Sequence, residues 1–155
     1  MKYNLNRSGF TMIELIFVIV ILGILAAVAV PRLAATRDDA QNVVMAQGIM
    51  TGAGEIGSYV VAHGESNESL AVMSGTVASL VAAGKADIDT ANKAAYFHMG
   101  NVTQCVIMDI NSSTSDENLT LSFGDAGGDS YCLGLQSVLD VRQYPIKLRG
   151  ATVEH

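Results

Sequence analysis

Hydrophobic residues are concentrated near the start of the chain, in a stretch without charge. Residues 15–31 are 17 consecutive uncharged positions, 15 of them hydrophobic. A helix that crosses the hydrocarbon core of a bilayer needs about 20 apolar residues, and the largely apolar positions 10–13 supply the missing turn. The pattern therefore predicts a helix over residues 10–31 that is long enough to span a membrane.

Beyond Pro31 the pattern becomes periodic. Apolar and small residues recur at steps of three and four, which is the spacing of one helix face: Leu33, Thr36, Ala40, Val43, Gln47, Met50, Ala53, Gly57 and Val60. The helix is therefore expected to continue as an amphipathic half. Glycines in this half weaken a helix by about 1 kcal/mol each relative to alanine. They mark either close packing of another element or a weak part of the helix: Gly48, Gly52, Gly54 and Gly57.

The remainder of the chain predicts a short helix followed by strands. Residues 64–69 form a polar break, after which a second helix is expected over 70–84, with Ser69 as its N-cap and Gly84 at its end. Four β-rich segments separated by turn-rich stretches then predict an antiparallel meander, at residues 102–110, 119–123, 131–139 and 144–153. The fold class is α+β, with the long N-terminal helix packed on a C-terminal antiparallel sheet.

Composition and charge narrow the class of protein. The chain has 155 residues, of which 50% are hydrophobic and 15% charged, with a net charge of -6. This composition excludes an intrinsically disordered chain, and the acidic balance argues against a nucleic-acid-binding surface. The charge is uneven, because residues 1–32 carry a net +2 and residues 33–155 a net -8. A slightly basic, apolar head is therefore joined to an acidic body.

Three interpretations of this head compete. Lys2 and Arg7 precede the apolar run, as in a cleavable secretory signal, and residues 27–29 imitate its small-residue cleavage site. The same basic residues also fit a plain N-terminal anchor with the body exported. Both interpretations leave Glu14 unexplained, although an ionisable residue near the start of a membrane helix is a functional-site hypothesis. The alternative is that Glu14 has no special role and simply lies at the boundary between the lipid headgroups and the hydrocarbon core.

The third interpretation accounts for Glu14. The sequence Arg-Ser-Gly-Phe-Thr-Met-Ile-Glu-Leu at residues 7–15, which runs into the apolar stretch, closely resembles the class III signal of type IV pilins and type II secretion pseudopilins. The resemblance implies cleavage by a prepilin peptidase between Gly9 and Phe10 and N-methylation of Phe10. It divides the chain into a leader (1–9), a transmembrane and filament-core helix (10–31) and a globular pilin-like domain (32–155).

In this family the apolar helix stays attached and serves first as a membrane anchor and then as filament core. A carboxylate buried in such a core needs a partner of opposite charge, and the resemblance assigns Glu14 to the N-terminal amine of Phe10 on a neighbouring subunit. Pro31 removes one helical hydrogen bond, so it either ends the membrane segment or kinks the helix, and the family resemblance implies the kink.

The resemblance also implies a function and a location. The chain is expected to be a structural subunit of a type IV-like filament rather than an enzyme, and most specifically a type II secretion pseudopilin. A type IV pilus subunit and a competence pseudopilin for DNA uptake are the alternatives in the family. A secreted or anchored binding domain with an ordinary signal is the alternative outside it.

The implied location is the bacterial inner membrane, crossed once, with the globular domain in the periplasm and the assembled filament in the periplasm or at the cell surface. The implied partners are other pilin-like subunits in a homo- or hetero-oligomeric filament, prepilin peptidase, an inner-membrane assembly platform and, before assembly, membrane lipid. No direct contact with nucleic acid is expected.

The two cysteines, Cys105 and Cys132, both fall on predicted strands. An exported body would occupy an oxidising compartment, which favours a disulfide between those strands. Two buried free thiols remain the alternative.

Few residues suggest chemistry. No metal site, cofactor or catalytic set is expected, since no nucleophile set, phosphate loop or dinucleotide fingerprint occurs in the sequence. Acidic residues on two predicted loops are a weak candidate for Ca²⁺, and a solvated acidic surface is the preferred interpretation: Asp116, Glu117, Asp125 and Asp129.

Three asparagines, Asn67, Asn111 and Asn118, each begin an Asn-x-Ser/Thr triplet and each have an acidic residue two positions earlier. This pattern resembles the extended acceptor of bacterial N-glycosylation systems. Loops are also rich in asparagine and serine because these residues favour turns, so both interpretations stay open.

Overall fold

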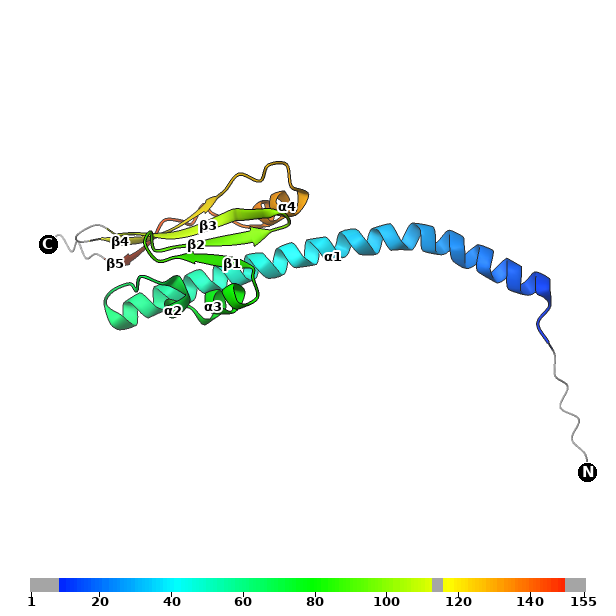
Figure 1. Cartoon of the computed structure of the whole chain (residues 1–155), viewed down its shortest axis with the longest axis horizontal. Coiled ribbons are helices and arrows are strands. Elements are labelled where there is room, and N and C mark those ends of the chain that lie inside the picture. Colours follow the sequence, from blue (N-terminus) through cyan, green and yellow to red (C-terminus); the bar gives the residue numbers. More distant parts are fainter. Residues whose placement is uncertain (1–8, 113–115, 150–155) are drawn as a thin grey trace, which may run out of the picture. The chain divides into compact units, whose positions relative to one another are not determined.

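The structure, a computed structural model, describes residues 9–112 and 116–149. The chain divides into two compact units, Met1–Asp38 and Asp39–His155, and the division falls inside the first helix, α1 (Met12–His63). The predicted α+β fold is confirmed: α1 is followed by two short helices and a five-stranded antiparallel sheet (Figure 1). The leader residues Lys2 and Arg7 lie outside the described residues.

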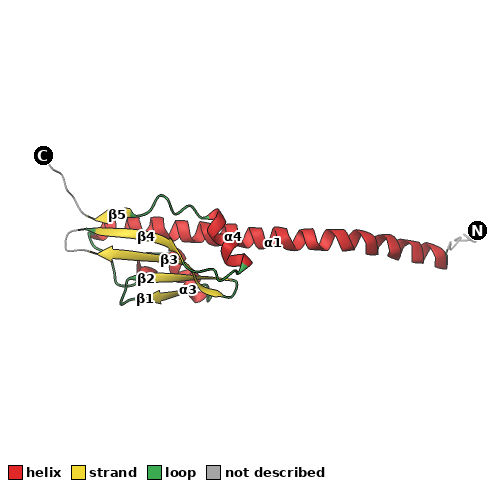
Figure 2. Cartoon of the chain, turned by 90° about the horizontal axis from the view of Figure 1, so that it is seen from above, coloured by secondary structure: helices red, strands yellow, loops and turns green. Residues whose placement is uncertain are grey.

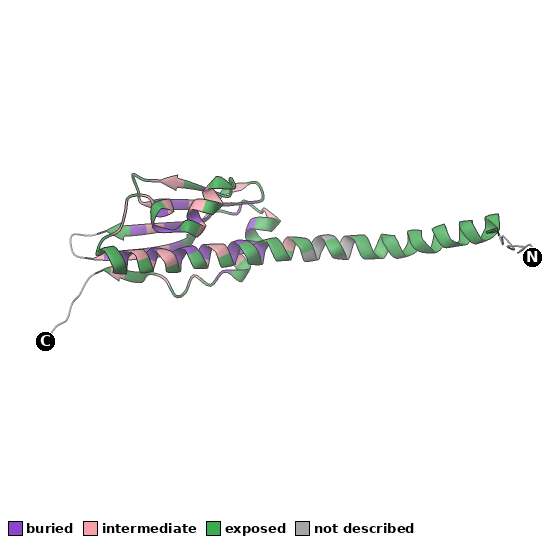
Figure 3. Cartoon of the chain, turned by 90° about the horizontal axis from the view of Figure 1, so that it is seen from below, coloured by how far each residue is buried: buried purple, intermediate pink, exposed green. Residues whose placement is uncertain are grey.

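The first unit is helical from Met12 onward. Its apolar side chains are exposed along the whole stretch from Met12 to Val30. Figure 3 shows this stretch in green, the colour of exposed residues, with no buried face. This stretch is the one helix in the described residues that is long and apolar enough to cross a membrane, with a mean hydropathy of 3.1 over 19 residues. Length and composition fit a bilayer span.

In the second unit, the part of α1 from Asp39 to His63 has one buried face. Its buried side chains recur at helical spacing: Asn42, Met45, Ala46, Ile49, Ala53, Ile56 and Val60. The predicted face was partly wrong: Ala53 and Val60 are buried, but Ala40, Val43 and Gln47 are exposed. Several consecutive apolar residues around Val43 allow more than one three-to-four spacing, and the sequence pattern alone did not choose between them.

The predicted helix over 70–84 is two helices, α2 (Leu70–Met73) and α3 (Gly75–Ala82), interrupted at Ser74. Ser74 adopts an extended backbone and its hydroxyl caps α3 by accepting from the N–H of Val77. That hydroxyl also donates to Glu55 of α1 at 2.6 Å. The interruption therefore attaches α3 to α1.

Close packing of α3 on α1 explains one of the glycines. A Cβ added at Gly52 would lie 2.8 Å from Val77 Cγ2, whereas one added at Gly54 would meet nothing within 4 Å. Gly52 is thus a site of close approach between α3 and α1. Gly84, with φ of +67°, ends the helical region as predicted.

The contact between α3 and α1 also affects Glu55. The hydrogen bond from Ser74 and those from Thr76 lower the pKa of the Glu55 carboxyl.

The sheet follows chain order: β1 (Ala86–Asp89), β2 (Ala94–Met99), β3 (Val102–Ser112), β4 (Glu117–Phe123) and β5 (Ile146–Arg149). All neighbouring strands pair antiparallel, so the predicted meander is confirmed. In Figure 2 the strands lie side by side over the second half of α1. Alternate residues face inward and form the core with α1, among them Phe97, Val106, Met108, Leu119 and Leu121.

The sequence patterns of 102–110 and 119–123 correspond to β3 and β4, and β5 lies within 144–153. The sequence did not predict β1 and β2, which are only four and six residues long. The prediction of a strand over 131–139 was wrong, because this segment is the helix α4 (Ser130–Val138). Its buried residues Cys132, Leu135 and Leu139 recur every three to four positions rather than every two.

Candidate functional site

The junction between the predicted leader and the mature chain lies immediately before α1. Gly9 and Phe10 precede the helix and are exposed, with Phe10 at 85%. Neither residue is held in a strand or helix. The peptide bond that a peptidase would cut is therefore accessible in the described structure.

Glu14 and Thr11 cap the start of α1 reciprocally. The Glu14 carboxylate accepts from the backbone N–H and the hydroxyl of Thr11, both at 2.8 Å, and the N–H of Glu14 donates to the Thr11 hydroxyl at 3.3 Å. This arrangement is a capping box, which satisfies two N–H groups that lack helical partners. The sequence signal for this cap, missed in the prediction of Glu14, is the Thr-x-x-Glu spacing of residues 11–14. Glu14 therefore has a role within its own helix besides any pairing between subunits.

Pro31 lies inside α1, so the helix does not end there. The side chain of Pro31 is outside the described part of the structure, and a kink at this position stays a prediction.

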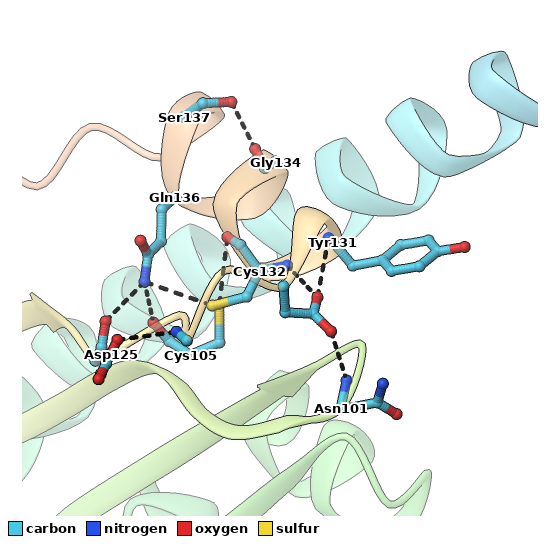
Figure 4. The surroundings of a disulfide bond; sticks show 11 residues. Asn101, Cys105, Asp125, Tyr131, Cys132, Gly134, Gln136 and Ser137 are labelled. Atoms are coloured by element: carbon cyan, nitrogen blue, oxygen red, sulfur yellow. Dashed lines mark hydrogen bonds between the residues drawn. A yellow bond between two sulfur atoms is a disulfide. The ribbon is translucent and has the colours of Figure 1, made fainter.

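A disulfide joins Cys105 of β3 to Cys132 of α4 (Figure 4). Both cysteines are fully buried, and their Cα atoms are 5.6 Å apart. The bond links a strand to a helix, not two strands as the sequence predicted. Near it, the side-chain amide of Gln136 donates to the carbonyls of Cys105 and Gly124, at 2.9 and 3.0 Å. A covalent bond and two hydrogen bonds thus fasten α4 to the sheet.

Asp129 fixes the start of α4. Its carboxylate accepts from the N–H groups of Tyr131 and Cys132, as an N-cap, and also from the N–H of Asn101 in the turn before β3. The backbone hydrogen bonds from Cys132, Asn101 and Tyr131 lower the pKa of Asp129. This cap, at the boundary of the segment mistaken for a strand, was the signal that would have indicated a helix.

Glu117 is the most buried charged group in the described residues, at 5% exposure. It accepts from the hydroxyl and N–H of Ser66, at 2.7 and 3.2 Å, and lies 3.6 Å from the Lys93 ammonium. Burial alone would raise the pKa of this carboxyl, but the hydrogen bonds of Ser66 and the charge of Lys93 outweigh burial and lower it. The cluster joins the loop after α1 to β4.

Lys93 has an unusual backbone in this cluster, with φ of +48°. Its ammonium also donates to the hydroxyls of Ser66 and Ser112, at 3.0 and 3.4 Å. A lysine rarely adopts the left-handed region, and these contacts hold it there. The cluster therefore connects three regions that are distant in sequence: the loop after α1, the turn before β2 and the paired ends of β3 and β4.

The acidic residues considered for Ca²⁺ do not gather around one point. Asp116 pairs with Lys147 at 3.2 Å, and Asp125 accepts from the N–H of Gly127. Glu117 and Asp129 have the separate contacts described above. Within residues 9–112 and 116–149, no group of three or more His, Cys, Asp or Glu side chains is placed to hold a metal ion.

The described histidines do not form a site. His98 lies on β2, with Nε2 3.0 Å from Asp87 Oδ2 but without the alignment of a hydrogen bond. His63, the last residue of α1, stacks on Tyr59 with ring centroids 3.9 Å apart. His155 lies outside the described residues. These contacts are local and provide no arrangement for acid–base chemistry.

Comparison with known proteins bears on the head of the chain. Residues 4–30 match the family model of the prokaryotic N-terminal methylation motif. The type IV wide pilus major component PilA4 of Thermus thermophilus is 52% identical over 40 residues. That alignment covers 26% of this chain and 30% of the relative. No solved structure matches the chain.

Proposed function

We propose that the chain is a non-enzymatic structural subunit of a type IV-like filament, because residues 4–30 match the N-terminal methylation motif and part of the chain is similar to a type IV pilus component. The observation that carries the proposal is the arrangement at its N-terminus. An accessible Gly9–Phe10 junction is followed by Glu14 and by an apolar helical stretch, Met12–Val30, that is entirely exposed. Such a surface requires lipid or other subunits to cover it.

Cleavage and methylation of the N-terminus prepare this segment for assembly into the filament. Prepilin peptidase cuts after Gly9, and the new amino group of Phe10 is methylated. The amine then lies next to Thr11, whose contacts hold the Glu14 carboxylate at the same end of α1. In the filament, Glu14 pairs with the Phe10 amine of a neighbouring subunit, because a misplaced subunit would leave both charges unpaired in an apolar core.

Before assembly the subunit waits in the bacterial inner membrane, crossed once by α1, with the body on the periplasmic side. The basic leader stays inside, as the positive-inside rule requires. An inner-membrane platform then extracts the subunit into the filament. The exposed apolar span supports the membrane location, and the basic residues Lys2 and Arg7 that precede it support the orientation.

The finer role predicted from the sequence, a pseudopilin of type II secretion, stays a prediction that rests on the small size of the chain. A second candidate, a pilus subunit, is favoured by the similarity to the wide-pilus component and by the disulfide in the body. Genes encoding a secretin and a secretion ATPase beside this gene would support the first role. A neighbouring retraction ATPase would support the second.

The experiment that tests the shared proposal is N-terminal sequencing of the mature protein together with electron microscopy of sheared filaments. N-methyl-Phe10 at the terminus and filaments that contain the chain are expected. A terminus near Val30 would establish an ordinary cleaved signal, and an intact Met1 a plain anchor. Either result would overturn the proposal.

A further inference from the structure

The three Asn-x-Ser/Thr triplets differ in their surroundings. The triplet of Asn111 includes residue 113, which lies outside the described residues. Those of Asn67 and Asn118 are complete in the structure, together with the acidic residue that precedes each, Glu65 and Asp116. These two can therefore be compared group by group.

The groups around Asn118 are engaged in the sheet. Asn118 lies on β4 between β3 and β5, where its register partners are Asn111 and Lys147. The hydroxyl of Thr120, the third residue of its triplet, donates to the carbonyl of Asp109 at 3.2 Å. Asp116 pairs with Lys147 at 3.2 Å. An enzyme that must reach the triplet in an extended chain would have to separate β4 from its neighbours.

Asn67 lies instead in the loop between α1 and α2, outside any helix or strand. Its side-chain carbonyl accepts from the N–H of Ser69 at 3.0 Å. Ser69 occupies the N-cap position of α2, yet its hydroxyl does not cap that helix. In the described part of the chain, the Asn67 Nδ2 and the Ser69 hydroxyl have no hydrogen-bond partner, and Glu65 is exposed.

The loop is held in this conformation from one side. The hydroxyl and N–H of Ser66 are bound by Glu117, and the N–H of Asn67 approaches Met73 Sδ at 3.1 Å. The backbone before Asn67 is therefore fixed, while the amide nitrogen of its side chain is uncommitted. A substituent on that nitrogen would break none of the hydrogen bonds of the loop.

We propose that Asn67 is the acceptor of an N-linked glycan, transferred from a lipid-linked oligosaccharide pyrophosphate by a membrane-bound transferase after export of the body. Asn67 Nδ2 forms a bond to C1 of the first sugar, the bond from C1 to the pyrophosphate oxygen breaks, and the lipid pyrophosphate leaves. The amide nitrogen loses one proton, which neutralises the departing phosphate or passes to water. The hydrogen bond from Ser69 to Oδ1 stabilises the charge that this oxygen gains as the proton leaves.

Glu65 and Ser69 complete the recognition element. An acidic side chain two residues before the acceptor offers a charge to a cationic group of the transferase, and Glu65 is exposed. The free hydroxyl of Ser69 offers a donor and an acceptor. The inference depends on export of the body and not on filament formation, so it can fail or hold independently of the proposed function.

The test is mass spectrometry of the full chain purified in detergent from membranes of its own host. The wild-type protein is expected to carry a glycan on the peptide that contains Asn67. Asn67→Gln removes the mass shift, and Asn118→Gln, the matched control, retains it. Ser69→Ala reduces the modification by about tenfold or more, while Ser69→Thr, which keeps the hydroxyl, restores it.

Folding of each variant is checked by the presence of the disulfide, so that loss of the glycan is not confused with loss of the fold. A glycan that persists in Asn67→Gln would place the acceptor elsewhere and overturn the proposal. An unmodified Asn67 in the wild-type chain from its host would overturn it as well.

Discussion

The two halves of α1 are continuous in backbone but opposite in their surroundings. From Met12 to Val30 every side chain is exposed, although nearly all are apolar. From Asp39 to His63 one face is buried in the core of the body and the other is exposed. A helix that is apolar all round requires a lipid or protein environment, whereas a helix with one buried face satisfies that face within its own domain. The comparison separates what this chain stabilises by itself from what it leaves for other molecules.

The largest expected effect concerns the single charge in the exposed half. Glu14→Leu is expected to leave membrane insertion intact and to abolish filaments, because the Phe10 amine of the neighbouring subunit would be buried unpaired. Filaments are quantified by shearing and immunoblotting, and insertion by resistance to carbonate extraction.

Glu14→Gln distinguishes charge pairing from helix capping, because glutamine can preserve the capping box while removing the charge. Loss of filaments in this variant supports pairing between subunits. Normal filaments from Glu14→Gln would show that the contacts with Thr11 are the function of this residue.

A matched pair of truncations tests the comparison itself. Ile56 is fully buried in the second half of α1, and Ile21 is 41% exposed in the first. Ile56→Ala is expected to lower the free energy of unfolding of the body by about 3–4 kcal/mol, and Ile21→Ala to leave it unchanged. Chemical denaturation of the full chain in detergent, followed by circular dichroism, measures both. Equal effects of the two substitutions would contradict the division of the helix.

The disulfide is expected to contribute slightly less. Replacing Cys105 and Cys132 together by serine removes a cross-link over 27 positions, which lowers the free energy of unfolding by about 3 kcal/mol in the chain-entropy model. The same denaturation experiment applies, with non-reducing peptide mapping of the wild-type chain as control. An unchanged unfolding midpoint would mean that Gln136 and the core hold α4 without the bond.

The smallest predicted effect depends on pH. The pKa of Glu117 is lowered below its ordinary value of 4.5, so its contribution is complete above that pH and is lost as the pH falls through the pKa of the folded state. Acid below about pH 4.5 should therefore destabilise the body. Glu117→Gln should lower stability at neutral pH by about 2 kcal/mol and flatten this acid dependence. An acid transition as steep as that of the wild type would show that other carboxylates control it.

The elements that the sequence predicts correctly are those in which one physical effect dominates. The apolar run, the methylation motif of residues 4–30 and the alternating strands β3 and β4 are each specified by local pattern. The exposed half of α1 was easy to predict because no tertiary contact modifies it.

Prediction from the sequence fails where contacts between distant segments determine the local structure. Residues 131–139 contain β-branched and aromatic residues that favour strands, but the cap at Asp129 and the core around Cys132 and Leu135 stabilise a helix instead. The short strand β1 has little intrinsic preference and depends on its pairing with β2. The cluster of Ser66, Lys93 and Glu117 could not be predicted, because its members are brought together only by the folded sheet.

The disulfide also determines how the body responds to pulling. A filament transmits force along its subunits, and a subunit that unfolds under tension lengthens by the contour of the chain it releases. Cys105 and Cys132 enclose 27 residue steps, which would otherwise release about 90 Å at roughly 3.5 Å per residue. With the bond intact this length of chain is not released, because the pulling force passes from β3 to α4 through the two bonded sulfur atoms.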